Sequence, residues 1–219
     1  MFTADLYYSF RSPYSYLGSW RYLELTRDYA LEIRLRPVYP AAIRFPGFFK
    51  ARNPLFAPYL IRDVARVAEM TGVPCRRPDP DPVQFAAPGE AAEDQPYIYR
   101  LTWLGLEAAR RGRGLAFACE VGKTLWGDHV KDWHLGTHLA DAVGRAGLDL
   151  AELDAAIQGR DAELDAEVRA NQTTEEEAGH WGAPCLVVES PEGPEPFFGQ
   201  DRIDMAVWWM KARGLTART

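Results

Sequence analysis

The sequence predicts an α/β fold in which a β-α-β unit near the start and a β-β-α unit near the end are separated by a long helical block. Strand-like apolar runs occur only toward the two ends of the chain, and helical periodicity fills the middle. The 219 residues are 47% hydrophobic and include seven tryptophans, which is enough to fill a substantial core. One core with a large insertion fits this length better than two separate domains.

The start of the chain forms the first unit. Residues 3–10 are rich in aromatic side chains and predict a buried strand. Ser12 and Pro13 suit the N-cap and the first turn of a helix that follows. Residues 31–36 alternate apolar and charged side chains, which is typical of a strand, and Pro37 ends it. This β-α-β order favours a right-handed crossover, so we expect the two strands to be a parallel pair.

The middle of the chain reads as helical. Helices are predicted over residues 58–72, 97–112, 114–126, 131–146 and 150–173. The Pro-rich, acidic segment 76–96 has no periodicity and predicts an irregular connection. No strand is expected between about residues 42 and 179.

The end of the chain returns to strand patterns. Residues 184–189 and 196–198 predict two short strands, and Asp201 suits the N-cap of a last helix that runs to residue 211. This element order predicts a thioredoxin-like fold split by a large all-helical insertion. Residues 1–41 and 179–219 would form the thioredoxin-like domain, and residues 42–178 the helical insertion domain.

Composition argues against several classes of partner. A net charge of −6 is unsuited to nucleic-acid binding, which needs clustered Lys and Arg. No apolar run approaches the length of a membrane helix, and no secretory signal is visible, so we expect no membrane partner. Cys75, Cys119 and Cys185 are far apart and form no C-x-x-C or metal-finger pattern. A reduced, cytoplasmic protein without a metal is expected.

The pair Ser12 and Ser15 stands where thioredoxin-like folds carry their reactive C-x-x-C, between the first strand and the first helix. Without cysteines, this motif cannot perform disulfide exchange. A serine hydroxyl and the free N–H groups of a helix N-terminus can still donate to an anion. A ligand thiol placed there would ionise more easily. The simpler alternative is an N-cap that binds nothing.

The dipeptide Ala183-Pro184 precedes an apolar strand and matches the position of the cis-proline in thioredoxin-like folds. We predict a cis bond, which would turn the backbone groups of Ala183 outward to pair with a peptide-like ligand. The alternative is an ordinary trans proline at the start of a strand.

Several segments together resemble one family. In order, they are YSFRSPYSYLG, LRPVYP, KARNP, HWGAPCLVV and FFGQDRIDMAVWW. They resemble the 2-hydroxychromene-2-carboxylate isomerases, which are similar to kappa-class glutathione transferases. The resemblance covers nearly the whole chain. It implies glutathione as cofactor and cis–trans isomerisation of a small ring-opened aromatic catabolite. The chain departs from the family at Tyr8-Ser9-Phe10, where an aspartate is usual.

The resemblance also implies roles for individual residues. Ser12 would face the glutathione sulfur and is the candidate catalytic residue. The other implied glutathione contacts are Ala183, Pro184, Asn53 and the pair Asp201 and Arg202, which would meet the γ-glutamyl end. The chemistry of the reaction, rather than the resemblance, makes Lys50 or Arg36 the candidate to hold the substrate carboxylate.

Other readings of the sequence remain open. A glutathione transferase would consume glutathione in a stable conjugate, and a non-catalytic binding protein would keep only the fold. Trp208-Trp209 favours core or the seam of a homodimer over a platform for a ligand. His134 and His138, four apart on a predicted helix, could share a metal, but a solvated or packed pair is favoured. Gly122-Lys123-Thr124 only weakly resembles the end of a phosphate loop.

Overall fold

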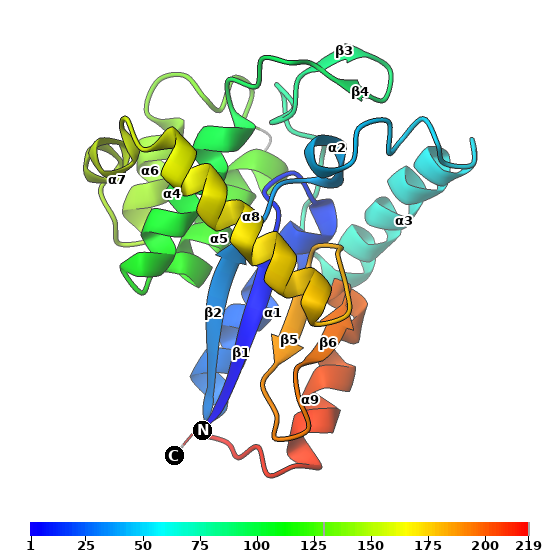
Figure 1. The fold of residues 1–219 in the computed structure, drawn as a ribbon, viewed down its shortest axis with the longest axis vertical. Helices are drawn as coiled ribbons and strands as arrows, with labels where there is room; N and C mark the ends of the chain where they lie inside the picture. Colours follow the sequence, from blue (N-terminus) through cyan, green and yellow to red (C-terminus); the bar gives the residue numbers. More distant parts are fainter. Residues whose placement is uncertain (129, 219) are drawn as a thin grey trace.

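The computed structural model describes residues 1–128 and 130–218, and a four-stranded mixed sheet forms its centre (Figure 1). The strands are β1 (Phe2–Tyr8), β2 (Leu31–Pro37), β5 (Cys185–Val188) and β6 (Glu195–Phe198), in the order β2-β1-β5-β6. β1 runs parallel to β2 and antiparallel to β5, and β5 runs antiparallel to β6. The predicted thioredoxin-like core is therefore confirmed, and the first and last parts of the chain meet at the β1–β5 pair.

Helices cover both faces of this sheet. α1 (Pro13–Asp28) and α9 (Ile203–Lys211) lie behind it in the view of Figure 1, and α8 (Asp161–Glu177) crosses in front. Alternation along β1 explains this arrangement, because Leu6 and Tyr8 pack into the large core with α1 and α9. Tyr7 points to the other face and packs with Cys185 in a smaller cluster.

The insertion contains further helices and one short ribbon. The helices are α2 (Ala41–Arg44), α3 (Phe56–Thr71), α4 (Ile98–Arg110), α5 (Gly114–Gly122), a π-helical turn (Lys123–Gly127), α6 (His138–Arg145) and α7 (Leu150–Ile157). The expectation of no strand between residues 42 and 179 is wrong. β3 (Phe85–Ala87) and β4 (Glu90–Ala91) pair within segment 76–96. They are too short to produce a periodicity. The Gln95 side chain helps to hold the ribbon by bonding the N–H and C=O of Gln84, at 2.9 Å each.

Two helix boundaries differ from the sequence expectation. Residues 150–173 form two helices rather than one, because the chain turns at Gly159 with φ +71°. α6 begins only at His138, so His134 precedes the helix and the two histidines do not share a helical face. Within the described part of the chain, no group of three or more His, Cys, Asp or Glu residues could hold a metal ion.

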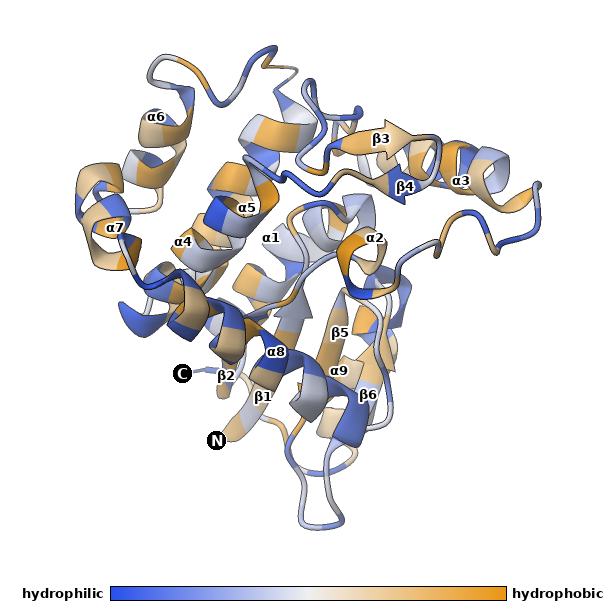
Figure 2. Ribbon diagram, turned by 45° about the horizontal axis from the view of Figure 1, so that its top comes forward, coloured by the Kyte–Doolittle hydropathy of each residue, from blue (hydrophilic) through white to orange (hydrophobic). Residues whose placement is uncertain are grey.

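Helix α3 projects from the body of the molecule (Figure 2). All of its residues are described and none is buried, and Tyr59, Ile61 and Met70 are exposed apolar side chains on it. Trp208 on α9 is also exposed, whereas Trp209 packs against Phe197. These surfaces are open to a second copy of the chain, and the homodimer stays a prediction. Among the described residues, no helix combines the length and the apolar character needed to cross a bilayer.

Candidate functional site

The junction of β1 and α1 provides the first part of the candidate site. Ser12 is the N-cap of α1, as predicted, and its Oγ accepts the N–H of Ser15 at 3.2 Å. The carbonyl of Ser12 accepts the N–H of Tyr16 at 3.2 Å, and Pro13 has no N–H. The N–H of Tyr14 lies in the first turn, where helix N–H groups lack an intrahelical partner. Ser12 Oγ and Tyr14 N–H are therefore the donors that α1 offers to an anion.

The second part comes from the other end of the chain. The Ala183–Pro184 bond is cis, which confirms the prediction from sequence. Ser12 Oγ donates to the carbonyl oxygen of Ala183 at 3.2 Å, across a sequence separation of 171 residues. The carbonyl of Pro184 accepts the N–H of Gly199 at 2.8 Å, which ties the end of β6 to the same place. The structure thus brings together the serine, the cis-proline and the Gly199 turn.

Asp201 and Arg202 follow Gly199 in a short 3-10 turn (Gln200–Arg202). The expected N-cap role of Asp201 is wrong, because α9 begins at Ile203 and no side-chain cap bond occurs at this described helix start. The Asp201 side chain is 61% exposed, with a carboxylate oxygen 3.5 Å from the Arg202 guanidinium. Burial and a bond to Asp63 raise the pKa of Tyr14, and the charge of Asp201 adds to this rise. The turn that contains Asp201 packs against α1, since a Cβ on Gly18 would lie 3.0 Å from Gln200 Cβ.

Gly199 shapes this turn, and replacing it should weaken the site. Its φ is +97°, and an added Cβ would collide with Asp201 Oδ1. We expect Gly199→Ala to lower the free energy of unfolding by about 1–3 kcal/mol and to displace the Asp201 carboxylate. Gly193→Ala is the matched control, since Gly193 also has a positive φ, +118°, but an added Cβ meets nothing within 4 Å. Equal losses of stability in both variants, measured by urea denaturation, would mean that the Asp201 collision has no effect.

The remaining predicted site residues are bonded to other partners. Asn53 is exposed and its Oδ1 accepts the N–H of Leu55 at 2.9 Å, just before α3. Lys50 forms an exposed ion pair with Glu90 of β4. Arg36 pairs with Asp5 at 3.1 Å, on the sheet face that α8 covers. No hydrogen bond or ion pair among the described residues joins any of these three to Ser12 or Ala183.

An aromatic cluster beside the cis-proline was not expected from the sequence. It consists of Phe45, Phe48, His180, Trp181 and Phe198. The Trp181 ring meets the Phe45 and Phe48 rings edge-on at 5.4 and 5.7 Å, and His180 stacks on Phe198 at 4.1 Å. Gly182 permits this packing, because a Cβ there would lie 2.6 Å from the Phe198 ring. Trp181 and Phe198 keep about two-fifths of their surface exposed, so the cluster offers an apolar surface to a planar ligand.

Arg11, directly before Ser12, also escaped prediction. Its guanidinium forms two bonds to the Asp81 carboxylate, at 2.9 and 3.0 Å, and lies over the Phe85 ring at 4.9 Å. The pair is largely buried and spans 70 residues of sequence. It fixes the segment containing β3 and β4 next to the start of α1, and Figure 1 shows that ribbon above this end of the sheet.

The three cysteines are free and unsuited to act as nucleophiles. Burial raises the pKa of Cys75 to about 11 and those of Cys119 and Cys185 to about 12. Cys185 follows the cis-proline, but its side chain packs with Tyr7 on the face of the sheet opposite to α1 and α9. A thiolate at this site would therefore have to come from a ligand.

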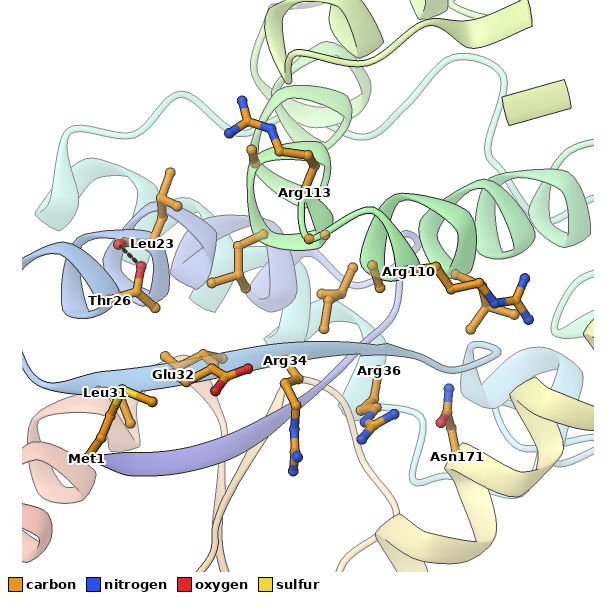
Figure 3. Close-up of a pocket in the computed structure, with 18 of the residues that line it drawn as sticks. Met1, Leu23, Thr26, Leu31, Glu32, Arg34, Arg36, Arg110, Arg113 and Asn171 are labelled. Carbon is orange, nitrogen blue, oxygen red and sulfur yellow. Dashed lines mark hydrogen bonds between the residues drawn. The ribbon is translucent and has the colours of Figure 1, made fainter. Parts of the chain in front are cut away.

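A cavity of about 690 Å³ follows the edge strand β2 and does not include Ser12, Ala183 or Asp201 (Figure 3). Some of its arginines pair with neighbouring carboxylates, whereas Arg113 and Arg218 donate to the backbone carbonyls of Ala146 and Tyr29. Arg34 pairs with Asp5 and Glu189, and Arg110 pairs with Glu107 and Glu167. Its size alone does not make it a site, because its lining includes no cysteine or histidine and none of the residues that carry the helix-terminus site.

The chain is similar to a known protein family and to several solved structures. A family profile described as DSBA-like thioredoxin domain matches residues 3–207. A solved 2-hydroxychromene-2-carboxylate isomerase is 21% identical, with a TM-score of 0.67 over 96% of this chain and 95% of that one. A probable DsbA oxidoreductase from Streptomyces coelicolor is 17% identical, with a TM-score of 0.64 over 100% and 94% of the two chains.

The cytosolic disulfide reductase DsbM from Pseudomonas aeruginosa is similar as well. It is 16% identical, with a TM-score of 0.63 over 96% of this chain and 98% of that one. A second structure of that reductase, with GSH, matches at a TM-score of 0.59 and 16% identity, over 96% and 99% of the two chains. At these identities the solved structures establish a shared fold. None of the curated proteins compared with this chain matches it.

Proposed function

Because the chain belongs to the DSBA-like thioredoxin family, we propose that it uses the helix-terminus site of that fold to bind glutathione instead of carrying its own reactive cysteine. The single observation that carries the proposal is the 3.2 Å bond between Ser12 Oγ and the Ala183 carbonyl, beside a cis-proline. The Ser12 hydroxyl occupies the position at which a disulfide oxidoreductase needs a thiol. The buried cysteines elsewhere, with raised pKa values, do not replace it.

The groups around Ser12 suit the parts of this tripeptide. The backbone of Ala183 would pair with the cysteinyl unit as an added strand. Ser12 Oγ and Tyr14 N–H would donate to the sulfur, and the helix dipole would favour its negative charge. Asp201 would attract the ammonium and Arg202 the carboxylate of the γ-glutamyl unit. For Ser12 to donate to sulfur, its hydroxyl must turn away from the Ala183 carbonyl.

We further propose isomerisation of a ring-opened aromatic catabolite of the 2-hydroxychromene-2-carboxylate type. When bound, glutathione would supply a thiolate for reversible addition to the conjugated C=C bond, about which rotation then becomes free. Ser12 would stabilise negative charge on sulfur before addition and after release. The aromatic cluster would hold the planar ring. Lys50 remains the better candidate for the substrate carboxylate, since its ion pair with Glu90 is more exposed than the pair of Arg36 with Asp5 on the face covered by α8.

The family match and several likenesses support this proposal. The segments around Ser12, Pro184 and Asp201 resemble the isomerase family, and a solved isomerase shares the fold over 96% of the chain. A reductase of the same fold has been solved with GSH and is described as cytosolic. We propose the same cytoplasmic location here.

Product analysis tests the reaction. We expect a catalytic amount of glutathione to support complete isomerisation of a cis-configured hydroxybenzylidenepyruvate, because the thiol is returned in each turnover. Liquid chromatography with mass spectrometry should find the isomer and undiminished glutathione. A stable adduct that consumes glutathione mole for mole would instead identify a transferase. If the protein turns over no activated alkene, the isomerase proposal is wrong and the chain is a binding protein without catalytic activity.

A further inference from the structure

A buried arginine connects three parts of the chain next to the candidate site. The Arg44 side chain, at the end of α2, is only 4% exposed. One of its nitrogens, Nη1, donates to Glu175 Oε2 at 2.8 Å and to the carbonyl oxygen of Trp181 at 2.7 Å. The other, Nη2, donates to Glu176 Oε1 at 2.8 Å. The guanidinium therefore binds α8 and the segment before the cis-proline at the same time.

Stability alone explains this arrangement poorly. Glu175 has no exposed side-chain surface, and its second oxygen, Oε1, has no hydrogen-bond partner among the described residues. Removing two charges from water often outweighs their attraction, and apolar replacements of buried ion pairs are frequently neutral or stabilising. An arginine can, however, hold several acceptors in fixed directions, which a lysine or an apolar side chain cannot.

The segment that Arg44 holds leads directly to Ser12. Trp181 lies two residues before Ala183, whose carbonyl accepts the Ser12 hydroxyl. The Trp181 ring also packs on Phe45, the residue after Arg44. Between them, the Gly182 N–H donates to His180 Nδ1 at 2.9 Å. The His180 N–H also bonds the Glu175 carbonyl at 3.2 Å, and the Arg44 guanidinium joins the Trp181 carbonyl to both α2 and α8.

We propose that Arg44, held by Glu175 and Glu176, is a positioning residue that fixes the Trp181–Pro184 segment and thereby aims the Ala183 backbone at the thiol ligand. This inference rests on the proposed glutathione function for its ligand, but the positioning itself is a property of the fold. Arg44 acts through Trp181 and touches neither glutathione nor substrate.

Protonation of Glu175 should weaken its interaction with Arg44. Burial raises the pKa of Glu175 to about 7, although Arg44 lowers it. The other groups that face this carboxyl are Glu176 on α8, Tyr7 on β1 and Cys185 on β5. Because folding raises this pKa, the folded protein favours the protonated form of Glu175. The contribution of Glu175 to the free energy of unfolding is therefore fully present below its ordinary pKa and is lost as pH rises through about 7. Above that pH the charged carboxylate binds Arg44 most strongly.

The test compares Arg44→Met, Arg44→Lys and Glu175→Gln with the unchanged protein. We expect Arg44→Met to weaken glutathione binding at least tenfold by calorimetry and to speed hydrogen exchange of the Gly182 amide at least tenfold by NMR. Arg44→Lys should recover only part of both. Arg34→Met is the matched control, because Arg34 also binds two carboxylates but is more exposed and makes no bond to residues 180–184.

Glu175→Gln keeps the inference testable if Arg44→Met does not fold. Its amide oxygen can still accept from Arg44, so the fold should persist. Amide exchange is itself base-catalysed, and the Gly182 N–H donates to His180, whose pKa burial lowers. The quantity to compare is therefore the Gly182 protection factor, the intrinsic exchange rate divided by the observed rate, and the change that this factor shows near neutrality in the unchanged protein should be absent in Glu175→Gln. Unchanged Gly182 exchange in a folded Arg44→Met protein would overturn the inference, as would an unaltered pH dependence in Glu175→Gln. Faster Gly182 exchange in Arg44→Met, in a protein that never binds glutathione, would support the positioning and refute the proposed function.

Discussion

Ser12→Ala should lower glutathione-dependent turnover by about 100-fold, since removing one donor from a site of developing negative charge typically has an effect of this size. The hydroxyl is one of two donors that α1 offers to the sulfur, and the Tyr14 N–H would remain. Loss of the Ser12–Ser15 cap should reduce the free energy of unfolding by about 1 kcal/mol, so the variant should fold. The pKa of the bound thiol should rise, and its ultraviolet thiolate absorbance should shift to higher pH.

Ser15→Ala is the appropriate control for that experiment. Ser15 is buried in the same first turn, and its Oγ accepts the N–H of Ser9 at 3.4 Å rather than facing the Ala183 carbonyl. Turnover in Ser15→Ala should stay within about threefold of the unchanged protein. If both variants titrate the bound thiol like the unchanged protein, Ser12 is an N-cap and nothing more.

Asp201→Asn should weaken glutathione binding about tenfold, because a charge-assisted hydrogen bond to the ligand's ammonium is worth about 1.5 kcal/mol at the lower end of its range. The lower end applies because the side chain is 61% exposed and therefore screened by water. Since Asp201 caps no helix, stability without ligand should change by no more than about 0.5 kcal/mol. Isothermal titration and thermal unfolding measure the two quantities separately.

A neighbouring carboxylate provides the control. Asp204 is 85% exposed and pairs with Arg21 on α1. Asp204→Asn should leave the affinity unchanged. Wild-type affinity in Asp201→Asn would remove the γ-glutamyl assignment from this turn.

Local sequence signals were sufficient to predict the sheet, the N-cap at Ser12 and the cis bond before Pro184. The strand patterns and the Ser12-Pro13 start of α1 depend on neighbouring residues, and so does the glycine and proline chemistry around Pro184. These features can therefore be recognised in a single sequence without structural information. The bond between Ser12 and Ala183 was not predicted, because it depends on how the two ends of the chain meet in the fold.

Interactions between distant residues could not be predicted in this way. The Arg11–Asp81 pair spans 70 residues and the Arg44–Glu175 pair spans 131, and neither arginine has a local pattern that indicates its partner. The ribbon of β3 and β4 depends on a bond from the Gln95 side chain. The Asp201 error has a different cause: the left-handed backbone at Gly199 starts a 3-10 turn one residue too early for Asp201 to cap α9.

The pairing of β5 with β1 also determines when the molecule can become complete during synthesis. A ribosome makes β1, α1, β2 and the whole insertion before β5 appears, so one edge of β1 has no partner in the nascent chain. Closing the 171-residue separation between Ser12 and Ala183 carries an entropic cost of about 4.5 kcal/mol, apart from a constant. Until then, apolar groups of β1 and α1 that later pack on β5 and α9 are accessible to chaperones or to neighbouring chains. The site is thus among the last parts of the protein to form, and a chain interrupted before β5 would carry the serine without the backbone that it faces.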